Sequence, residues 1–148
     1  IEHAACAGLY EHGGGICQVS STLFCAINRA GLDVIARTSH SKDVAYVPKG
    51  MDATVSWGGP EFIFKNSTNY PVRILIDASG GVLSVRVVGS NVSKPKINLD
   101  VQNDGNSITV IKTTTSSDGS TTQETISSKT PPTKEPSSQT TASAEPQQ

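Results

Sequence analysis

The sequence predicts an α+β fold, in which one main helix packs on a mostly antiparallel sheet of short strands and a disordered C-terminal tail follows. Three observations predict it. Apolar residues recur at helical spacing over residues 16–30, and short strand-like runs separated by Gly and Pro fill residues 33–88. From about residue 130 the chain consists mainly of Pro, Ser, Thr, Gln and Glu, a composition that buries too little apolar surface to fold.

The same composition shifts predict three segments. We expect one domain over residues 1–90, a linker with a candidate β-hairpin over residues 91–129, and the disordered tail over residues 130–148. The chain starts at Ile1 without a start signal, so we expect the domain to be truncated at its N-terminus.

Charge and hydropathy bound the partners. The net charge of −1 favours neither nucleic acid nor an anionic membrane surface. No apolar run approaches the roughly 18 residues that span a bilayer. Any membrane contact would therefore come through a missing N-terminal anchor, and the sequence leaves the oligomeric state open.

The predicted helix carries its apolar residues at steps of three, four, four and three, which places them on one face. We expect this face to be buried against the sheet, with Phe24 and Ala26 broadening it. Gly31 stands where a glycine commonly ends a helix. The residues of the face are Ile16, Val19, Leu23, Ile27 and Ala30.

The strands are predicted from short apolar or alternating runs that end at Gly, Pro, Asn or Asp. The strongest signal is a hairpin around Gly80-Gly81, and a second hairpin is indicated around Asn103-Asp104-Gly105. The predicted strands cover residues 33–37, 44–47, 53–57, 62–66, 72–77, 82–88, 96–101 and 107–112.

Three glycines run directly into Cys17, where the helical pattern begins. Glycine takes positive φ without strain and lets other groups approach closely. At a helix N-terminus, free N–H groups and the macrodipole favour negative charge, which suits a thiolate. We therefore predict that Cys17 is a nucleophile. The alternative is that its thiol simply packs, which is our interpretation of Cys25 in mid-helix.

A cysteine nucleophile needs a base, usually histidine, and often a third group that orients the base. The sequence offers His3, His12 and His40, of which we favour His40 and keep His12 as the alternative. Asp43 and Asp52 are candidate orienting residues, and Asp52 would serve equally as a turn cap. Groups near the helix start could bind an oxyanion or substrate. These are Gly14, Gly15, Gln18, Ser20 and Ser21.

Two other uses of such residues fit less well. A phosphate loop needs Lys followed by Ser or Thr after its last glycine, where this chain has Ile16-Cys17. The spacings of the histidines and the three cysteines match no common zinc pattern. We therefore predict no metal and no cofactor.

The run Gly13-Gly14-Gly15-Ile16-Cys17-Gln18-Val19-Ser20-Ser21-Thr22-Leu23-Phe24 closely resembles the signature of the VanW family. Four further blocks resemble the family in the same order, so that the match spans about residues 7–90. They are His40-Ser41 followed by Val44-Ala45-Tyr46-Val47-Pro48, then Gly50 with Asp52-Ala53-Thr54-Val55, then Gly58-Gly59-Pro60, and Phe64-Lys65-Asn66.

The resemblance implies an outward-facing protein of the bacterial cell envelope, secreted or membrane-anchored, from a family named for glycopeptide-resistance gene clusters of Gram-positive bacteria. It also implies a peptidoglycan L,D-transpeptidase acting on stem peptides. Cys17 would then be the acyl-enzyme nucleophile, with His40 and Asp52 as its partners. The alternative is a non-catalytic envelope module that binds a stem peptide or a glycopeptide.

Overall fold

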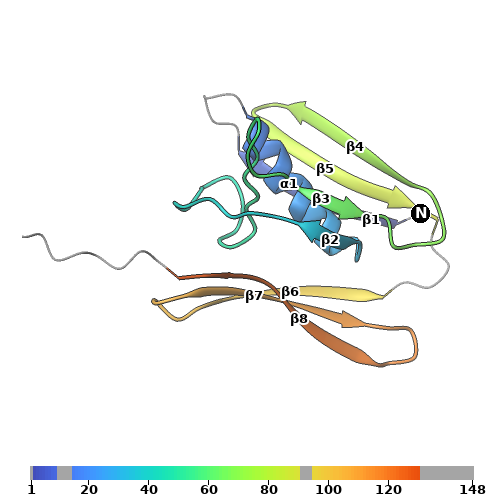
Figure 1. Ribbon diagram of the computed structural model, residues 1–148. Coiled ribbons are helices and arrows are strands. Elements are labelled where there is room, and N and C mark those ends of the chain that lie inside the picture. The colour runs from blue at the N-terminus through green and yellow to red at the C-terminus, as the bar shows by residue number, and fades with distance from the viewer. Residues whose placement is uncertain (1, 10–14, 91–94, 131–148) are drawn as a thin grey trace, which may run out of the picture.

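The structure, a computed structural model, describes residues 2–9, 15–90 and 95–130 (Figure 1). The described elements comprise one helix, α1 (Ile16–Arg29), and eight strands. The strands are β1 (Glu2–Leu9), β2 (Asp33–Ala36), β3 (Ile63–Lys65), β4 (Val72–Ser79), β5 (Val82–Gly89), β6 (Lys96–Asn103), β7 (Ile108–Thr115) and β8 (Thr121–Lys129).

The α+β class holds broadly, but the prediction of a helix on a single sheet is wrong. The described strands form three small antiparallel sheets, ordered β1-β5-β4, β2-β3 and β6-β7-β8. α1 packs on β1 and β5 and lies between that sheet and β6-β7-β8 (Figure 1). Alternation of apolar and polar residues predicts that a segment is extended, but it does not specify which strands pair. The sequence pattern therefore could not predict the number of sheets.

The helix ends as predicted. Gly31 has φ 75°, its N–H donates to the Asn28 carbonyl, and the N–H of Leu32 donates to the Ile27 carbonyl. This pair of bonds is a Schellman motif, in which a left-handed glycine closes the last turn.

The buried face of the helix differs from the prediction in its first turns. Ile16 is 57% exposed and Val19 37% exposed, whereas Phe24 and Ile27 are buried as expected. The first turn is held instead by hydrogen bonds on the side that carries Ser20. Apolar periodicity cannot reveal a helix face that is anchored by polar contacts.

Two predicted strands, residues 44–47 and 53–57, are irregular in the structure. Tyr46, Val47 and Ala53 are nevertheless buried in one core cluster with Phe24 of the helix. The apolar pattern of these segments therefore predicts correctly that they are buried and wrongly that they form strands. Helix side chains form hydrogen bonds with backbone groups, such as those of Ala53, that would otherwise pair with a neighbouring strand.

The hairpin at Gly80-Gly81 is confirmed, with both glycines at positive φ between β4 and β5. The candidate hairpin in residues 91–129 is present as β6-β7 and extended by β8 into a three-stranded sheet. Val110 of this sheet is fully buried in the core cluster that contains Phe24 and Ala53. The predicted disordered tail lies outside the described residues, apart from residue 130.

Gly50 marks the closest approach between the irregular segment and β7. Its φ is 77°, and a Cβ added there would lie 2.7 Å from Cγ2 of Val110. We expect Gly50→Ala to lower the free energy of unfolding by about 2–4 kcal/mol, combining left-handed strain and overpacking.

The matched control is Gly80→Ala. Gly80 has φ 59° and nothing within 4 Å of an added Cβ, so only backbone strain remains, about 1 kcal/mol. Urea unfolding of both variants measures the difference. Equal losses of unfolding free energy in the two variants would show that close packing of β7 against Gly50 does not contribute.

Candidate functional site

Cys17 lies in the first turn of α1, two residues after the N-cap Gly15, which has φ 64° and, among the described residues, nothing within 4 Å of an added Cβ. The position matches the prediction of a thiol at a helix N-terminus, where backbone N–H groups lack intrahelical partners. Cys17 is half-buried and free of any disulfide, with Sγ 3.4 Å from the Val55 carbonyl and 3.8 Å from Thr54 Oγ1.

Ser20 and Ser21 fasten the helix to the same segment. Ser20 Oγ lies 2.6 Å from the Ala53 carbonyl, and Ser21 Oγ accepts a hydrogen bond from the Ala53 N–H at 2.9 Å. Both hydroxyls also reach the Cys17 carbonyl, at 3.1 and 2.6 Å. Both side chains are buried, so their contacts fix Cys17 against residues 53–55.

His40 and Asp52 form a close pair. The His40 ring Nδ1 lies 2.8 Å from Asp52 Oδ2, and the His40 backbone N–H donates to the same oxygen at 2.5 Å. A carboxylate only accepts hydrogen bonds, so Nδ1 carries a proton, and in the neutral imidazole Nε2 is then the acceptor. The His40 side chain is 20% exposed and that of Asp52 5%, which buries the carboxylate and leaves the ring accessible.

Arg37 balances the buried carboxylate. Its Nη2 lies 3.2 Å from Asp52 Oδ1, its Nε donates to the Asp52 carbonyl at 2.6 Å, and its Nη2 donates to the Gly50 carbonyl at 3.0 Å. The guanidinium also lies 4.9 Å from the centre of the Phe24 ring. Burial lowers the pKa of Arg37 and Asp52 opposes that shift, so the guanidinium stays charged.

Residues 52–55 therefore connect the two halves of the candidate site. Asp52 holds His40, Ala53 is bound by the helix serines, and the last two residues contact Cys17 Sγ. The Thr54 N–H donates to the Thr38 carbonyl at 2.8 Å, which ties this segment to the stretch that precedes His40. The thiol and the His–Asp pair are thus held by one short stretch of backbone.

Gly14 and His12 lie outside the described residues. Gln18 is buried, and its carbonyl accepts a hydrogen bond from Thr22 Oγ1 at 2.7 Å. Cys25 is fully buried, as the packing interpretation predicts.

Within the described residues no group of three His, Cys, Asp or Glu side chains could hold a metal ion.

Sequence reasoning missed Arg37 and Thr54 as site residues. A signal for Arg37 existed, because an arginine at the end of an apolar strand is a natural partner for an acidic residue that has to be buried. Thr54 belongs to the Asp52-Ala53-Thr54-Val55 block, but nothing in the sequence pairs that block with the helix start.

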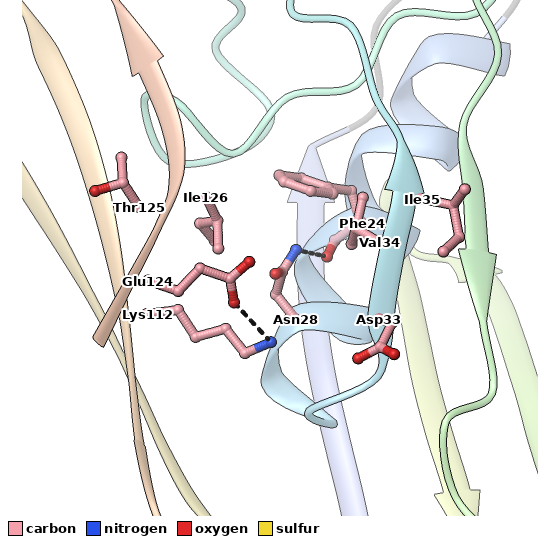
Figure 2. Close-up of a pocket in the computed structure, with 9 residues that line it drawn as sticks. All are labelled: Phe24, Asn28, Asp33, Val34, Ile35, Lys112, Glu124, Thr125 and Ile126. Carbon is pink, nitrogen blue, oxygen red and sulfur yellow. Dashed lines mark hydrogen bonds and ion pairs between the residues drawn. The ribbon is translucent and has the colours of Figure 1, made fainter. Parts of the chain in front are cut away.

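A cavity of about 390 Å³ lies between α1 and β2 on one side and β7 and β8 on the other (Figure 2). Lys112 faces it with Glu124, whose Oε2 lies 3.9 Å from Lys112 Nζ, and Asn28 and Asp33 line the opposite wall. Neither Cys17 nor the His40–Asp52 pair lines this cavity. It separates part of the C-terminal sheet from the helix and is distinct from the candidate site.

Asp43 follows His40 by three residues and lies 3.0 Å from Lys129 of β8 and 3.4 Å from Lys49. Hydrogen bonds from Lys129 and then Lys49 lower its pKa. The unfolded chain therefore binds the proton more tightly, so the stabilisation is present above the ordinary carboxyl range and is lost as the pH falls through the lowered folded value.

We expect Asp43→Asn to be only slightly less stable than the wild type at pH 7, because the exposed Asp43 carboxylate is screened by solvent. This difference in stability should shrink as the pH is lowered below about 4, where the aspartate of the unfolded chain begins to bind a proton. Thermal unfolding at several pH values measures it. A constant difference across the range would show that the lysines do not stabilise the charged form.

The fold and the site together define a small α+β protein with a thiol at a helix start, joined through one backbone segment to a His–Asp–Arg cluster whose carboxylate is buried. The chain belongs to the VanW family: the family model described as "VanW like protein" matches residues 8–88, more than half of the chain. Membership of this family suggests a protein of the cell envelope.

The chain is similar to the "Uncharacterized protein YoaR" of Bacillus subtilis (strain 168), with 52% identity over 85 residues. The aligned region covers 57% of this chain and 28% of that relative, so the chain spans well under a third of its length. No solved structure matches the chain. In the described part of the chain, no helix is long and apolar enough to cross a membrane.

Proposed function

We propose that this chain is the catalytic portion of a cysteine-dependent peptidoglycan L,D-transpeptidase on the outer face of the cell envelope. The observation that carries the proposal is the connection made by residues 52–55, which contact the Cys17 thiol at one end and hold His40 at the other. A nucleophile, a base and a residue that orients the base are the three parts that covalent acyl transfer needs.

The chemistry follows from the roles of the two ring nitrogens. His40 Nε2 takes the thiol proton while Cys17 Sγ attacks the acyl carbonyl of a donor stem peptide. The carbon–nitrogen bond to the terminal D-amino acid breaks, and its amine leaves with the proton from His40. An amine of a second stem then attacks the thioester, gives up a proton to His40, and regenerates the thiol as the crosslink forms.

The helix start contributes to the same step. Backbone N–H groups of the first turn point along the helix axis toward its N-terminal end. There they would stabilise the oxyanion that forms on the acyl carbonyl. Among the described residues, nothing lies within 4 Å of a Cβ added at Gly15, beside this turn. Ser20 and Ser21 support the step indirectly, because their hydroxyls fix the segment against which the thiol lies.

The test is a reaction of the chain with purified disaccharide-tetrapeptide, followed by liquid chromatography and mass spectrometry of the products. We expect a crosslinked dimer and release of the terminal D-amino acid from the wild type, and neither from Cys17→Ala. Cys25→Ala, which leaves the helix-start thiol in place, is the control and should remain active. Equal product from the wild type and Cys17→Ala would end the proposal.

One observation favours a second candidate, a non-catalytic module that binds stem peptides or glycopeptides. The Cys17 thiol faces the Val55 carbonyl at 3.4 Å, a contact that a protonated, packed thiol also makes. The alkylation rate of Cys17 by iodoacetamide at pH 7 separates the two candidates. A rate no faster than that of an unperturbed thiol would favour the binding module.

A further inference from the structure

β8 reaches the candidate site from outside the family-matched region of residues 8–88. Arg37 Nη1 donates a hydrogen bond to Ser127 Oγ at 3.1 Å, across 90 residues of sequence. Ser127 is buried and lies beside Gly50, whose carbonyl also accepts a hydrogen bond from Arg37. One guanidinium therefore joins the C-terminal sheet to the carboxylate that holds His40.

A β-bulge puts Ser127 in this position. Val110 of β7 is paired with Ser127, but the next residue, Ile111, is paired with Thr125, which leaves Ile126 as an extra residue in β8. Side chains alternate between faces in a regular strand, so neighbours such as Ile126 and Ser127 would point to opposite sides. Here Ile126 packs against the core cluster and Ser127 is buried as well. The bulge allows these two consecutive side chains to lie on the same side of the sheet.

A second contact from the same strand strengthens the attachment. Lys129 Nζ lies 3.0 Å from Asp43, and the Lys129 side chain is only 12% exposed. β8 thus holds the segment that carries His40 from both ends, at Arg37 before it and at Asp43 after it.

We propose that Ser127 is a positioning residue for the His40–Asp52 pair, acting through Arg37, so that the C-terminal sheet is part of the functional unit. Asp52 accepts hydrogen bonds from Arg37 and His40 on different oxygens, which makes the orientation of the carboxylate depend on both. Without the Ser127 hydroxyl, Arg37 loses a fixed partner and the carboxylate is held less firmly. The Nδ1–H···Asp52 bond should then open more often.

The test uses the full chain with three variants. Ser127→Ala removes the hydroxyl, Ser127→Thr retains it, and Ser128→Ala removes the hydroxyl of the adjacent, exposed residue as a matched control. The primary readout is the exchange rate of the His40 Nδ1 proton with water, measured by nitrogen-15-edited NMR. We expect it to rise about fivefold in Ser127→Ala, the factor that corresponds to one hydrogen bond of ordinary strength.

Ser127→Thr and Ser128→Ala should keep the wild-type exchange rate. Equal rates in Ser127→Ala and Ser128→Ala would overturn the proposal, as would a Ser127→Thr rate as high as that of Ser127→Ala in a folded protein. A merely structural role for Ser127 would lower the unfolding midpoint and leave the exchange of this one proton unchanged.

A kinetic arm rests on the proposed function. There, Ser127→Ala should lower kcat about fivefold at unchanged KM, because the His–Asp pair acts on the chemical step. A wild type without acyl-transfer activity would refute the proposed function only, since the proton exchange measured by NMR requires no turnover. An unchanged kcat together with faster exchange would limit the role of Ser127 to the resting geometry and overturn its part in the reaction.

Discussion

Asp52→Ala is expected to lower the free energy of unfolding by about 3–5 kcal/mol. The substitution leaves the buried guanidinium of Arg37 without its carboxylate and removes the acceptor of two hydrogen bonds from His40. A buried charge without a counterion costs far more than the net value of the pair it came from. Urea unfolding followed by circular dichroism measures the loss.

Asp52→Asn is the informative companion. The amide oxygen can still accept from Arg37, but the amide nitrogen is a donor that faces the donors of His40. The neutral amide also leaves Arg37 without a counter-charge, so we expect a stability loss of about 2–4 kcal/mol, smaller than that of the alanine variant only by the acceptor that is kept, together with a misoriented imidazole ring. If the two variants were equally unstable, the negative charge of Asp52, and not its hydrogen-bond acceptors, would be what the fold needs.

Under the proposed function, His40→Gln is expected to lower the rate of acyl transfer by about 10²–10⁴-fold, the usual contribution of a positioned acid or base. The stability effect should stay near 1 kcal/mol, because the backbone N–H at this position continues to donate to Asp52. Steady-state kinetics and urea unfolding of the same preparation measure both quantities.

The control for His40→Gln is Tyr46→Phe. The Tyr46 ring stands edge-on to the His40 ring with their centres 6.5 Å apart, so this variant keeps the ring contact and changes only a hydroxyl. Its rate should remain within a few-fold of the wild type. A His40→Gln variant as fast as the wild type would exclude His40 as the base and favour the alternative, His12.

Local patterns predicted the local features of the fold. The end of α1 at Gly31 and the Gly80-Gly81 hairpin depend on residues that adopt positive φ, and both are found. Residues 44–47 and 53–57 were predicted as strands because they are apolar, and they are buried without forming strands. The reason is long-range: the Ala53 backbone is paired with helix serines, which no local pattern can indicate.

The candidate site shows the same division. Cys17, His40 and Asp52 carry recognisable chemistry, so sequence reasoning could select each of them, and the structure places them along residues 52–55. Their catalytic roles stay predictions. Ser127 could not have been selected, because its contact with Arg37 depends on a β-bulge and on packing across 90 residues. Buried hydrogen-bond partners of a site are set by tertiary structure.

Under the proposed function, Cys17 is the nucleophile that accepts the acyl group. Intact-protein mass spectrometry after incubation with a carbapenem, followed by peptide mapping, tests it most directly, because an acyl adduct remains on the attacking sulfur. We predict one adduct per chain, located on Cys17, present in Cys25→Ala and absent in Cys17→Ala. A wild type that forms no adduct under conditions where it is folded, or an adduct that persists in Cys17→Ala, would contradict the claim.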